Sequence, residues 1–475
     1  MTVSYFIQCP VCNTVTRMRS SAGYIHRTPV RIHCGKCNTL LTGHFISDDA
    51  NAKAYFEPGN CTEVSARPYD YYGEASGELL CRKITYLPDE GLTIPTTLSP
   101  AMSFLMSIET EERDHFIDFA CHLASMREAW DKERIFYDLV INKKSDVLKR
   151  NYAHIAEING YSLESEVGVL CYYYYSYFTN IGGVFTKKNL ISNLRTVNYE
   201  INHLDRTALF DFIAFLQTGN RLQHAQARMY EIMESFIGIS SFVIPAIGAM
   251  RYREPDSINK EEIGISTCSF EDIKSFYQNT YEVLGEYCDI VIGLNNAKYR
   301  ESYESFAFNL TMEKFVDQTK GNRIKSLSQE ECFSSLFAIK DNSNELRNAI
   351  GHSDVKYNGT DQTIEYVPNH RKPSDSRSAF LLDVAIQCVE LMQSSVILSM
   401  IIYKLSFLLK CADTTSVQMH PMFYSGTHGS SRCPCGSGLP FRRCCKPIVS
   451  KYAKGFKMPT IMNHSNTAYD AGQID

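Results

Sequence analysis

The 475-residue sequence lacks the features that mark secreted, membrane-spanning or low-complexity proteins. Its N-terminus has no basic region followed by an apolar core and a small-residue cleavage site, so nothing predicts secretion. Two apolar stretches, residues 236–250 and 396–409, are shorter than the roughly 20 residues that cross a bilayer, and Lys404 interrupts the second. We find neither an internal repeat nor a long low-complexity run. A soluble cytoplasmic protein without a membrane partner is therefore expected.

Acidic residues are missing from both ends of the chain. Residues 1–45 hold five basic residues and no acid, and residues 432–457 hold seven basic residues and no acid. Residues 46–431 carry 36 basic against 51 acidic residues, so the net charge of -5 hides basic ends on an acidic body. Such ends suit modules that contact a polyanion such as RNA, although basic charge also serves solubility alone.

The 17 cysteines would indicate a disulfide scaffold in a small secreted domain, but eight of them form two tight clusters. In a reducing compartment, such clusters predict two structural zinc sites, one at each end of the chain. The other nine cysteines are scattered through apolar sequence and are expected to be buried small hydrophobic residues. Among them are Cys121, Cys171, Cys288 and Cys388.

The N-terminal cluster consists of two Cys-x2-Cys turns separated by 21 residues. Each turn supplies two thiolates to one tetrahedral zinc ion, and the arrangement resembles a zinc ribbon. The predicted ligands are Cys9, Cys12, Cys34 and Cys37. Three histidines are possible substitute ligands but are expected on the surface, since four cysteines are available: His26, His33 and His44.

The C-terminal cluster lies in the sequence CPCGSGLPFRRCC, which closely resembles the SEC-C motif, a compact zinc hairpin at the ends of many prokaryotic proteins. Gly436 and Gly438 supply the turn that lets the sulfurs converge. The sequence departs from the motif at Leu439 and Pro440, where lysines are common. The basic face is kept in part by Arg442, Arg443 and Lys446. The predicted ligands are Cys433, Cys435, Cys444 and Cys445.

Neither cluster is suited to catalysis, because four thiolates leave zinc no open position for water or substrate. Both sites are therefore predicted to be structural, and no catalytic metal is expected. The modules either dock to nucleic acid or to a protein partner, or they only hold small domains together.

Turn residues and short alternating runs predict strands over residues 1–98. From there, apolar residues at three- and four-residue spacing predict helices, within which the aromatic run 171–178 is expected to be packed core. The predicted fold class is mainly α, with helical bundle domains flanked by small β-rich zinc modules at both ends. The expected units are a zinc ribbon and short-strand region (1–98), a helical domain of unknown role (99–257), a second helical bundle (265–412), the SEC-C motif (428–448) and a basic, then disordered, tail (449–475).

The second helical domain has a readable order of elements. The expected helices span residues 270–297, 303–319 and 329–352, followed by a hairpin or loop at Asn358-Gly359 and a last long amphipathic helix. Ser328 and Glu331 predict a capping box at the start of the third helix.

One constellation in this domain suits chemistry: Arg347, Asn348 and His352, in the sequence ELRNAIGHSD at the end of the third helix. On a helix Asn348 and His352 share a face, and Arg347 lies beside it. Metal-free RNA cleavage requires an imidazole to move protons, a guanidinium to hold the phosphate and an amide to orient them. Alternatively, His352 caps helix-end carbonyls and Arg347 pairs on the surface with Glu345 or Asp354.

The order of elements and the Arg-Asn-x3-His motif resemble a HEPN domain over residues 269–411. This family of small helical bundles includes many endoribonucleases of toxin and phage-defence systems. The resemblance implies a homodimer in which two motifs share one cleft, with Arg347 binding the scissile phosphate, His352 acting as general acid or base and Asn348 orienting the site. A second Arg-His pair, Arg150 and His154, has a spacing one residue shorter and no matching bundle around it.

Two functions remain open on the sequence alone. The first is a metal-independent endoribonuclease, active in phage defence or a toxin-type stress response, whose zinc modules guide it to RNA or to a partner. The second is a non-catalytic adaptor that binds nucleic acid or protein and uses the HEPN-like unit for dimerisation. A zinc hydrolase is disfavoured, because no His-rich or carboxylate-bearing open site is visible.

Overall fold

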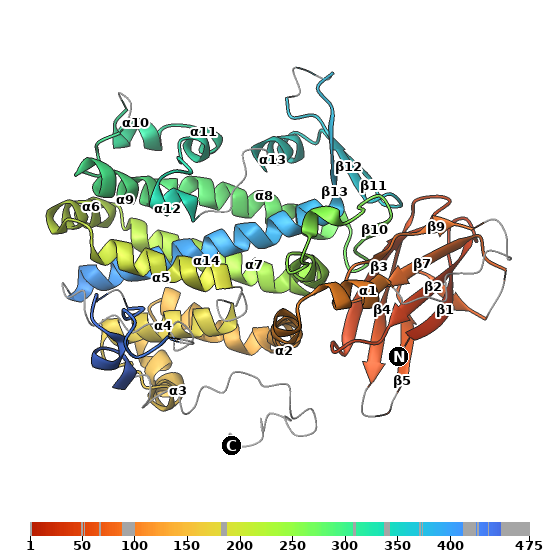
Figure 1. Cartoon of the computed structure of the whole chain (residues 1–475), viewed down its shortest axis with the longest axis horizontal. Helices are drawn as coiled ribbons and strands as arrows, with labels where there is room; N and C mark the ends of the chain where they lie inside the picture. The colour runs from red at the N-terminus through yellow and green to blue at the C-terminus, as the bar shows by residue number, and fades with distance from the viewer. Residues whose placement is uncertain are drawn as a thin grey trace.

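The computed structural model places a β region at one end of an elongated helical body and the C-terminal cysteine module near the other end (Figure 1). It describes residues 2–447 except 49–50, 52, 66–67, 88–99, 182–187, 307–309, 337–342, 370–371, 373, 412–423, 425–426 and 436. The predicted tail, 449–475, lies outside the described residues. The predicted mainly α architecture with a small N-terminal β region is confirmed.

The β region contains two sheets, ordered β6-β1-β2-β7-β9 and β3-β4-β5. Alternating apolar residues such as Tyr5 and Ile7 in the first sheet and Val30 and Ile32 in the second are buried between them, as the period of a strand requires. The strands are β1 (Thr2–Gln8), β2 (Val15–Ser21), β3 (Arg27–His33), β4 (Leu40–Asp48), β5 (Lys53–Pro58), β6 (Thr62–Val64), β7 (Tyr71–Ala75), β8 (Cys81–Arg82) and β9 (Thr85–Tyr86).

Helices follow from residue 100, as the spacing of apolar residues predicts. They are α1 (Pro100–Ser107), α2 (Thr110–Ile141), α3 (Ser145–Ile158), α4 (Glu166–Asn180), α5 (Lys188–Asn202), α6 (Arg206–Thr218) and α7 (Arg221–Ala249). The aromatic run lies on α4, where Tyr173, Tyr174 and Tyr177 are at most 1% exposed, so its prediction as packed core is confirmed.

The remaining elements are a short 3-10 helix (Pro255–Ser257), β10 (Ile263–Gly264), α8 (Phe270–Glu286), α9 (Cys288–Arg300), α10 (Met312–Val316), α11 (Lys320–Lys325), α12 (Cys332–Ser335), α13 (Ser343–Gly351), β11 (Val355–Asn358), β12 (Thr363–Tyr366), β13 (Arg377–Phe380) and α14 (Leu381–Cys411). Strand β10 pairs with β8, and β11, β12 and β13 form an antiparallel sheet. The predicted hairpin at Asn358-Gly359 is confirmed as the β11–β12 turn.

Several details of the predicted helices are wrong. Among the described residues of the predicted helix 303–319, only Met312–Val316 (α10) are helical. The predicted helix 329–352 contains two helices, α12 and α13, with residues 337–342 between them outside the described part. The first predicted helix, 270–297, is divided into two helices: α8 ends at Glu286, and α9 begins at Cys288. The predicted capping box at Ser328 is absent, because Glu331 pairs with Arg300 instead of closing the box. A capping box forms at the start of α8, where the Ser269 and Asp272 side chains each bond the other's backbone.

Helices α7 and α14 pack against each other in the middle of the body, and α14 also contacts α4, α5 and α8 (Figure 1). Both helices are long and apolar enough to cross a membrane, so the shortness of the apolar stretches was the wrong argument. Burial is the better argument that these helices belong to the core, because 67% of the most apolar stretch of α7 and 78% of that of α14 is buried inside the protein. They are core helices, and one hydrophobic core joins residues of both predicted helical domains.

Candidate metal centres and the Arg347–His352 edge

The first Cys-x2-Cys turn connects β1 to β2. The Cys9 amide donates to the Thr14 carbonyl (3.0 Å), and the Asn13 amide donates to the Cys9 carbonyl (3.0 Å). Asn13 has a φ of 59°, in the left-handed region that asparagine tolerates better than most residues. The turn therefore holds Cys9 and Cys12 on the same side.

The second turn, between β3 and β4, repeats this geometry. The Cys34 amide donates to the Thr39 carbonyl (2.9 Å), the Asn38 amide donates to the Cys34 carbonyl (2.9 Å), and Asn38 has a φ of 57°. Both turns read Cys-x2-Cys-Asn-Thr, so the chain contains a short repeat, contrary to the expectation that it has none. The repeated Asn-Thr pair is the signal that would have identified these residues as part of the site.

The four N-terminal sulfurs lie within 4.8 Å of one another. Cys9 and Cys37 Sγ are 3.6 Å apart, and Cys12 and Cys34 Sγ are 3.5 Å apart. Tetrahedral zinc with bonds of about 2.3 Å to sulfur separates its ligands by about 3.8 Å. The donor set and spacing therefore fit a zinc ion, which can be held by all four predicted cysteines.

Threonine hydroxyls support the outer thiol of each turn. Thr14 Oγ1 lies 3.2 Å from Cys12 Sγ, and Thr39 Oγ1 lies 3.1 Å from Cys37 Sγ. Burial raises the pKa of the Cys12 thiol, but its hydrogen bonds with the side chain and backbone of Thr14, together with those to Cys34 and Cys37, outweigh burial and lower the pKa to about 6. Both hydroxyls therefore favour the thiolate form that binds metal.

The C-terminal cysteines also converge, with all four sulfurs within 4.8 Å. Cys444 Sγ lies 3.5 Å from Cys435 Sγ and 3.7 Å from Cys445 Sγ, which again fits tetrahedral zinc. Gly438 makes the predicted turn with a φ of +75°, whereas Gly436 lies outside the described residues. Within the described part, the module is less β-rich than predicted: it has one isolated bridge, Arg432–Pro440, and a 3-10 helix (Phe441–Arg443).

The Arg-Asn-x3-His motif lies at the end of α13, which packs on α8. Arg347 Nη1 donates to Asn348 Oδ1 (2.7 Å), and a second guanidinium nitrogen pairs with Glu282 of α8. The side chains of Arg347 and Glu282 are each 25% exposed. The His352 amide donates to the Asn348 carbonyl (3.0 Å), so His352 lies one helical turn beyond Asn348, in an exposed position.

Glu282 is the residue of this edge that the sequence did not indicate. It also pairs with Lys320 Nζ (3.2 Å), so one carboxylate is shared by two cations. The partners considered for Arg347 from the sequence are Glu345 and Asp354; in the structure Glu345 pairs with Arg377. Because Glu282 lies far from α13 in the sequence, no local pattern reveals the pair.

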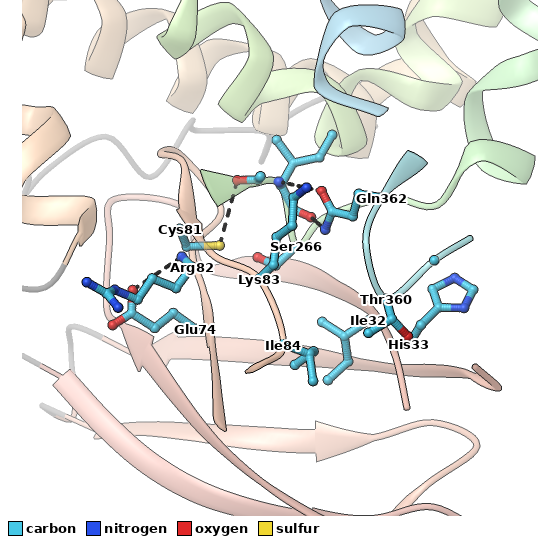
Figure 2. Close-up of a pocket in the computed structure, with 13 residues that line it drawn as sticks. Ile32, His33, Glu74, Cys81, Arg82, Lys83, Ile84, Ser266, Thr360 and Gln362 are labelled. Atoms are coloured by element: carbon cyan, nitrogen blue, oxygen red, sulfur yellow. Dashed lines mark hydrogen bonds between the residues drawn. The ribbon is translucent and has the colours of Figure 1, made fainter. Parts of the chain in front are cut away.

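Arg347, Asn348 and His352 line neither of two pockets in the described part of the chain, the one drawn in Figure 2 and a larger one. The larger pocket, about 450 Å³, lies beside α13 on the side of Leu346 and is bordered by the start of α14. The second Arg-His pair of the sequence, Arg150 and His154, lies at exposed positions of α3. His352 is exposed, and the described part of one copy of the chain forms no enclosed pocket around it.

The N-terminal cysteine cluster is joined to the hairpin that follows the motif. Asn38 Oδ1 accepts hydrogen bonds from the Gly359 and Thr360 amides (3.1 and 3.2 Å), and the His33 ring packs edge-on against Tyr357. Figure 2 shows His33 beside Thr360 at this contact. Since β11 begins shortly after His352, the second Cys-x2-Cys turn contacts the far end of the hairpin that follows the motif.

The contact between the β region and the hairpin leaves little free space. Gln362 exchanges two hydrogen bonds with the backbone of Ile265 (2.7 and 3.1 Å), and Lys83 Nζ donates to the Asp361 carbonyl (2.6 Å). The cavity among these residues, drawn in Figure 2, measures about 10 Å³, scarcely the volume of one water molecule. It is a packed joint and not a ligand site.

No protein-family model, curated protein or solved structure matches this chain. The resemblances to the zinc ribbon, SEC-C and HEPN families therefore rest on the motifs and their geometry.

Proposed function

We propose that this protein is a metal-independent endoribonuclease of the HEPN type that works as a homodimer. The observation that carries the proposal is the arrangement at the end of α13. Arg347 is held by the Asn348 amide, one helical turn from an exposed imidazole at His352. This is the set of groups that RNA cleavage through the 2'-hydroxyl needs.

In the proposed reaction one His352 imidazole accepts the proton of a ribose 2'-hydroxyl, and that oxygen attacks the adjacent phosphorus. The bond from phosphorus to the 5'-oxygen breaks, and the leaving oxygen takes a proton from a second imidazole. The products are a 2',3'-cyclic phosphate and a 5'-hydroxyl. Arg347 stabilises the negative charge that develops on the phosphoryl oxygens, with its guanidinium oriented by Asn348.

A homodimer follows from this chemistry. The reaction uses one imidazole as base and one as acid, and the Arg347–His352 edge of a single copy carries one. The edge is also open, so a second copy placed against it would enclose the phosphate and provide the second imidazole. By the family resemblance, the cellular role is phage defence or a toxin-type stress response in the cytoplasm.

The zinc modules are proposed to guide the nuclease to RNA or to a protein partner. Around the C-terminal cysteines, Arg432, Arg442, Arg443 and Lys446 are exposed, and residues 427–447 contain no acid. A surface of this kind attracts the phosphate backbone without reading sequence.

The test is incubation of purified protein with total RNA in the presence of EDTA. Wild type is expected to cleave, whereas Arg347→Ala and His352→Ala are each expected to lose about 100-fold or more in rate, since each removes a group that acts in the transition state. Arg150→Ala and His154→Ala are matched controls that remove an exposed Arg or His from another helix. Zinc content and circular dichroism should be equal in all variants.

The ion pair between Arg347 and Glu282 favours a second function, the non-catalytic adaptor. A guanidinium already neutralised by a carboxylate can serve to fasten α13 to α8. In that case Arg347→Ala lowers stability, His352→Ala changes nothing, and only cysteine substitutions abolish activity in cells.

A further inference from the structure

A lysine is buried in the C-terminal third of α14, the longest helix that the structure describes in the second half of the chain. Lys404, on α14, is 0% exposed, and its ammonium nitrogen has no hydrogen-bond partner among the described residues. An ionised amine without a compensating charge is among the most costly groups to bury. Its position therefore calls for a negative charge close by.

That charge is available in the C-terminal cysteine module. Burial lowers the pKa of the Lys404 amine to about 8, and the charges of Cys435 and Cys445 act in the opposite direction. The module is seated on α5, a helix that packs against α14. A Zn²⁺ ion with four thiolates has a net charge of -2, and one buried ammonium beside it reduces the total charge to -1. The module is thus the natural source of the missing counter-charge.

The module is also firmly seated on the helical body. Asn198 and Asn202 of α5 donate to the carbonyls of Pro434 (2.9 Å) and Cys435 (3.1 Å). Three of its four cysteines belong to the same hydrophobic core as α14. Figure 1 shows this segment, in dark blue, toward the end of the helical body that lies away from the β region. Its zinc site is therefore an internal part of the body and not a tethered appendage.

We infer that Lys404 is the buried counter-charge of the C-terminal zinc site and binds the charged zinc–thiolate cluster to the core of the protein. Lys404 is a positioning residue that stabilises the metal-loaded form electrostatically without ligating the metal. Removal of the metal, or of its thiolates, leaves an uncompensated ammonium in the core. Occupancy of the C-terminal site therefore controls the stability of α14, independently of whether the protein cleaves RNA.

The test compares zinc affinity by competition with a colorimetric chelator in two backgrounds. Cys9→Ser leaves the C-terminal site, and Cys433→Ser leaves the N-terminal one. Lys404→Met, which keeps length and removes charge, is expected to weaken C-terminal binding about 10- to 100-fold, the usual effect of losing an outer-shell partner. N-terminal binding should not change. Leu405→Met, a neutral change at the neighbouring fully buried position, is the matched control and should alter neither affinity.

A stability measurement separates this role from a merely structural one. Lys404→Met should raise the melting temperature of the zinc-free protein, because an unpaired charge is lost, and lower that of the zinc-loaded protein. A rise in both states, or an unchanged C-terminal affinity, would overturn the inference. If Lys404→Met does not fold, Lys404→Arg restores the charge and should retain zinc, whereas Lys404→Gln should lose it; equal affinity in these two variants also overturns it.

Discussion

Replacement of Asn38 by alanine tests the joint between the N-terminal cysteine cluster and the β11–β12 turn. Asn38 accepts hydrogen bonds from the Gly359 and Thr360 amides (3.1 and 3.2 Å) and from the Thr360 hydroxyl (3.3 Å). Asn13 occupies the same position of the first turn, with nearly the same φ (59° against 57°) and no such bond to the hairpin among the described contacts. Asn13→Ala is therefore a matched control for the effect of alanine at a left-handed backbone position.

The expected magnitudes follow from this comparison. Alanine in the left-handed region costs about 1–2 kcal/mol, and both variants carry that cost. Asn38→Ala also loses hydrogen bonds that are partly exposed to solvent, for a further loss of about 1–2 kcal/mol. The difference between Asn38→Ala and Asn13→Ala thus isolates the joint.

Hydrogen exchange of the Gly359 and Thr360 amides measures this difference locally. Relative to Asn13→Ala, the Asn38→Ala protein should exchange these amides about 5- to 30-fold faster, which corresponds to a loss of about 1–2 kcal/mol. Zinc content should be the same in both variants. Equal exchange at Gly359 in the two variants would refute the view that the zinc turn holds the hairpin.

Three further predictions concern other parts of the molecule. Glu282→Gln removes the carboxylate that pairs with Arg347, so the nuclease proposal expects tighter RNA binding. The slope of log binding constant against log salt concentration, measured by fluorescence anisotropy, should become steeper by about 0.7. An unchanged slope speaks against a phosphate contact. Burial lowers the pKa of His122, although backbone hydrogen bonds oppose this, so as pH falls the imidazole is protonated in the unfolded chain before the folded one. Urea titrations should therefore show the free energy of unfolding decreasing as pH drops below about 6.5. His122→Gln should make this pH dependence weaker. Cys9→Ser and Cys433→Ser should each lose one zinc ion per chain by metal analysis. Only Cys433→Ser should lower the melting temperature of the helices, because Cys433 belongs to their core. Identical melting curves of the two variants would contradict that assignment.

The zinc ligands could be predicted from the sequence because their constraint is local. A Cys-x2-Cys turn fixes two sulfurs within one stretch of chain, and the eight predicted cysteines do converge into two groups. The strands of residues 1–98 and the core role of the α4 tyrosines were predictable for a similar reason, since periodicity reports which face is buried.

Long-range contacts could not be predicted in this way. The Arg347–Glu282 pair, the bond from Asn38 to the β11–β12 turn and the seating of the C-terminal module on α5 all join segments that are distant in the sequence. Lys404 shows the limit most clearly. In the sequence it only interrupts an apolar run, and its significance appears only when the cysteine module is seated on α5, a helix that packs against α14.

The ends of the RNA products test the central proposal most directly. Total RNA treated with the wild-type protein in EDTA should carry 2',3'-cyclic phosphates and matching 5'-hydroxyls at discrete positions. These ends should be absent after treatment with a folded, zinc-loaded His352→Ala protein. Identical cyclic-phosphate ends from both proteins, or 3'-hydroxyl ends from the wild type, would contradict cleavage by the Arg347–His352 edge.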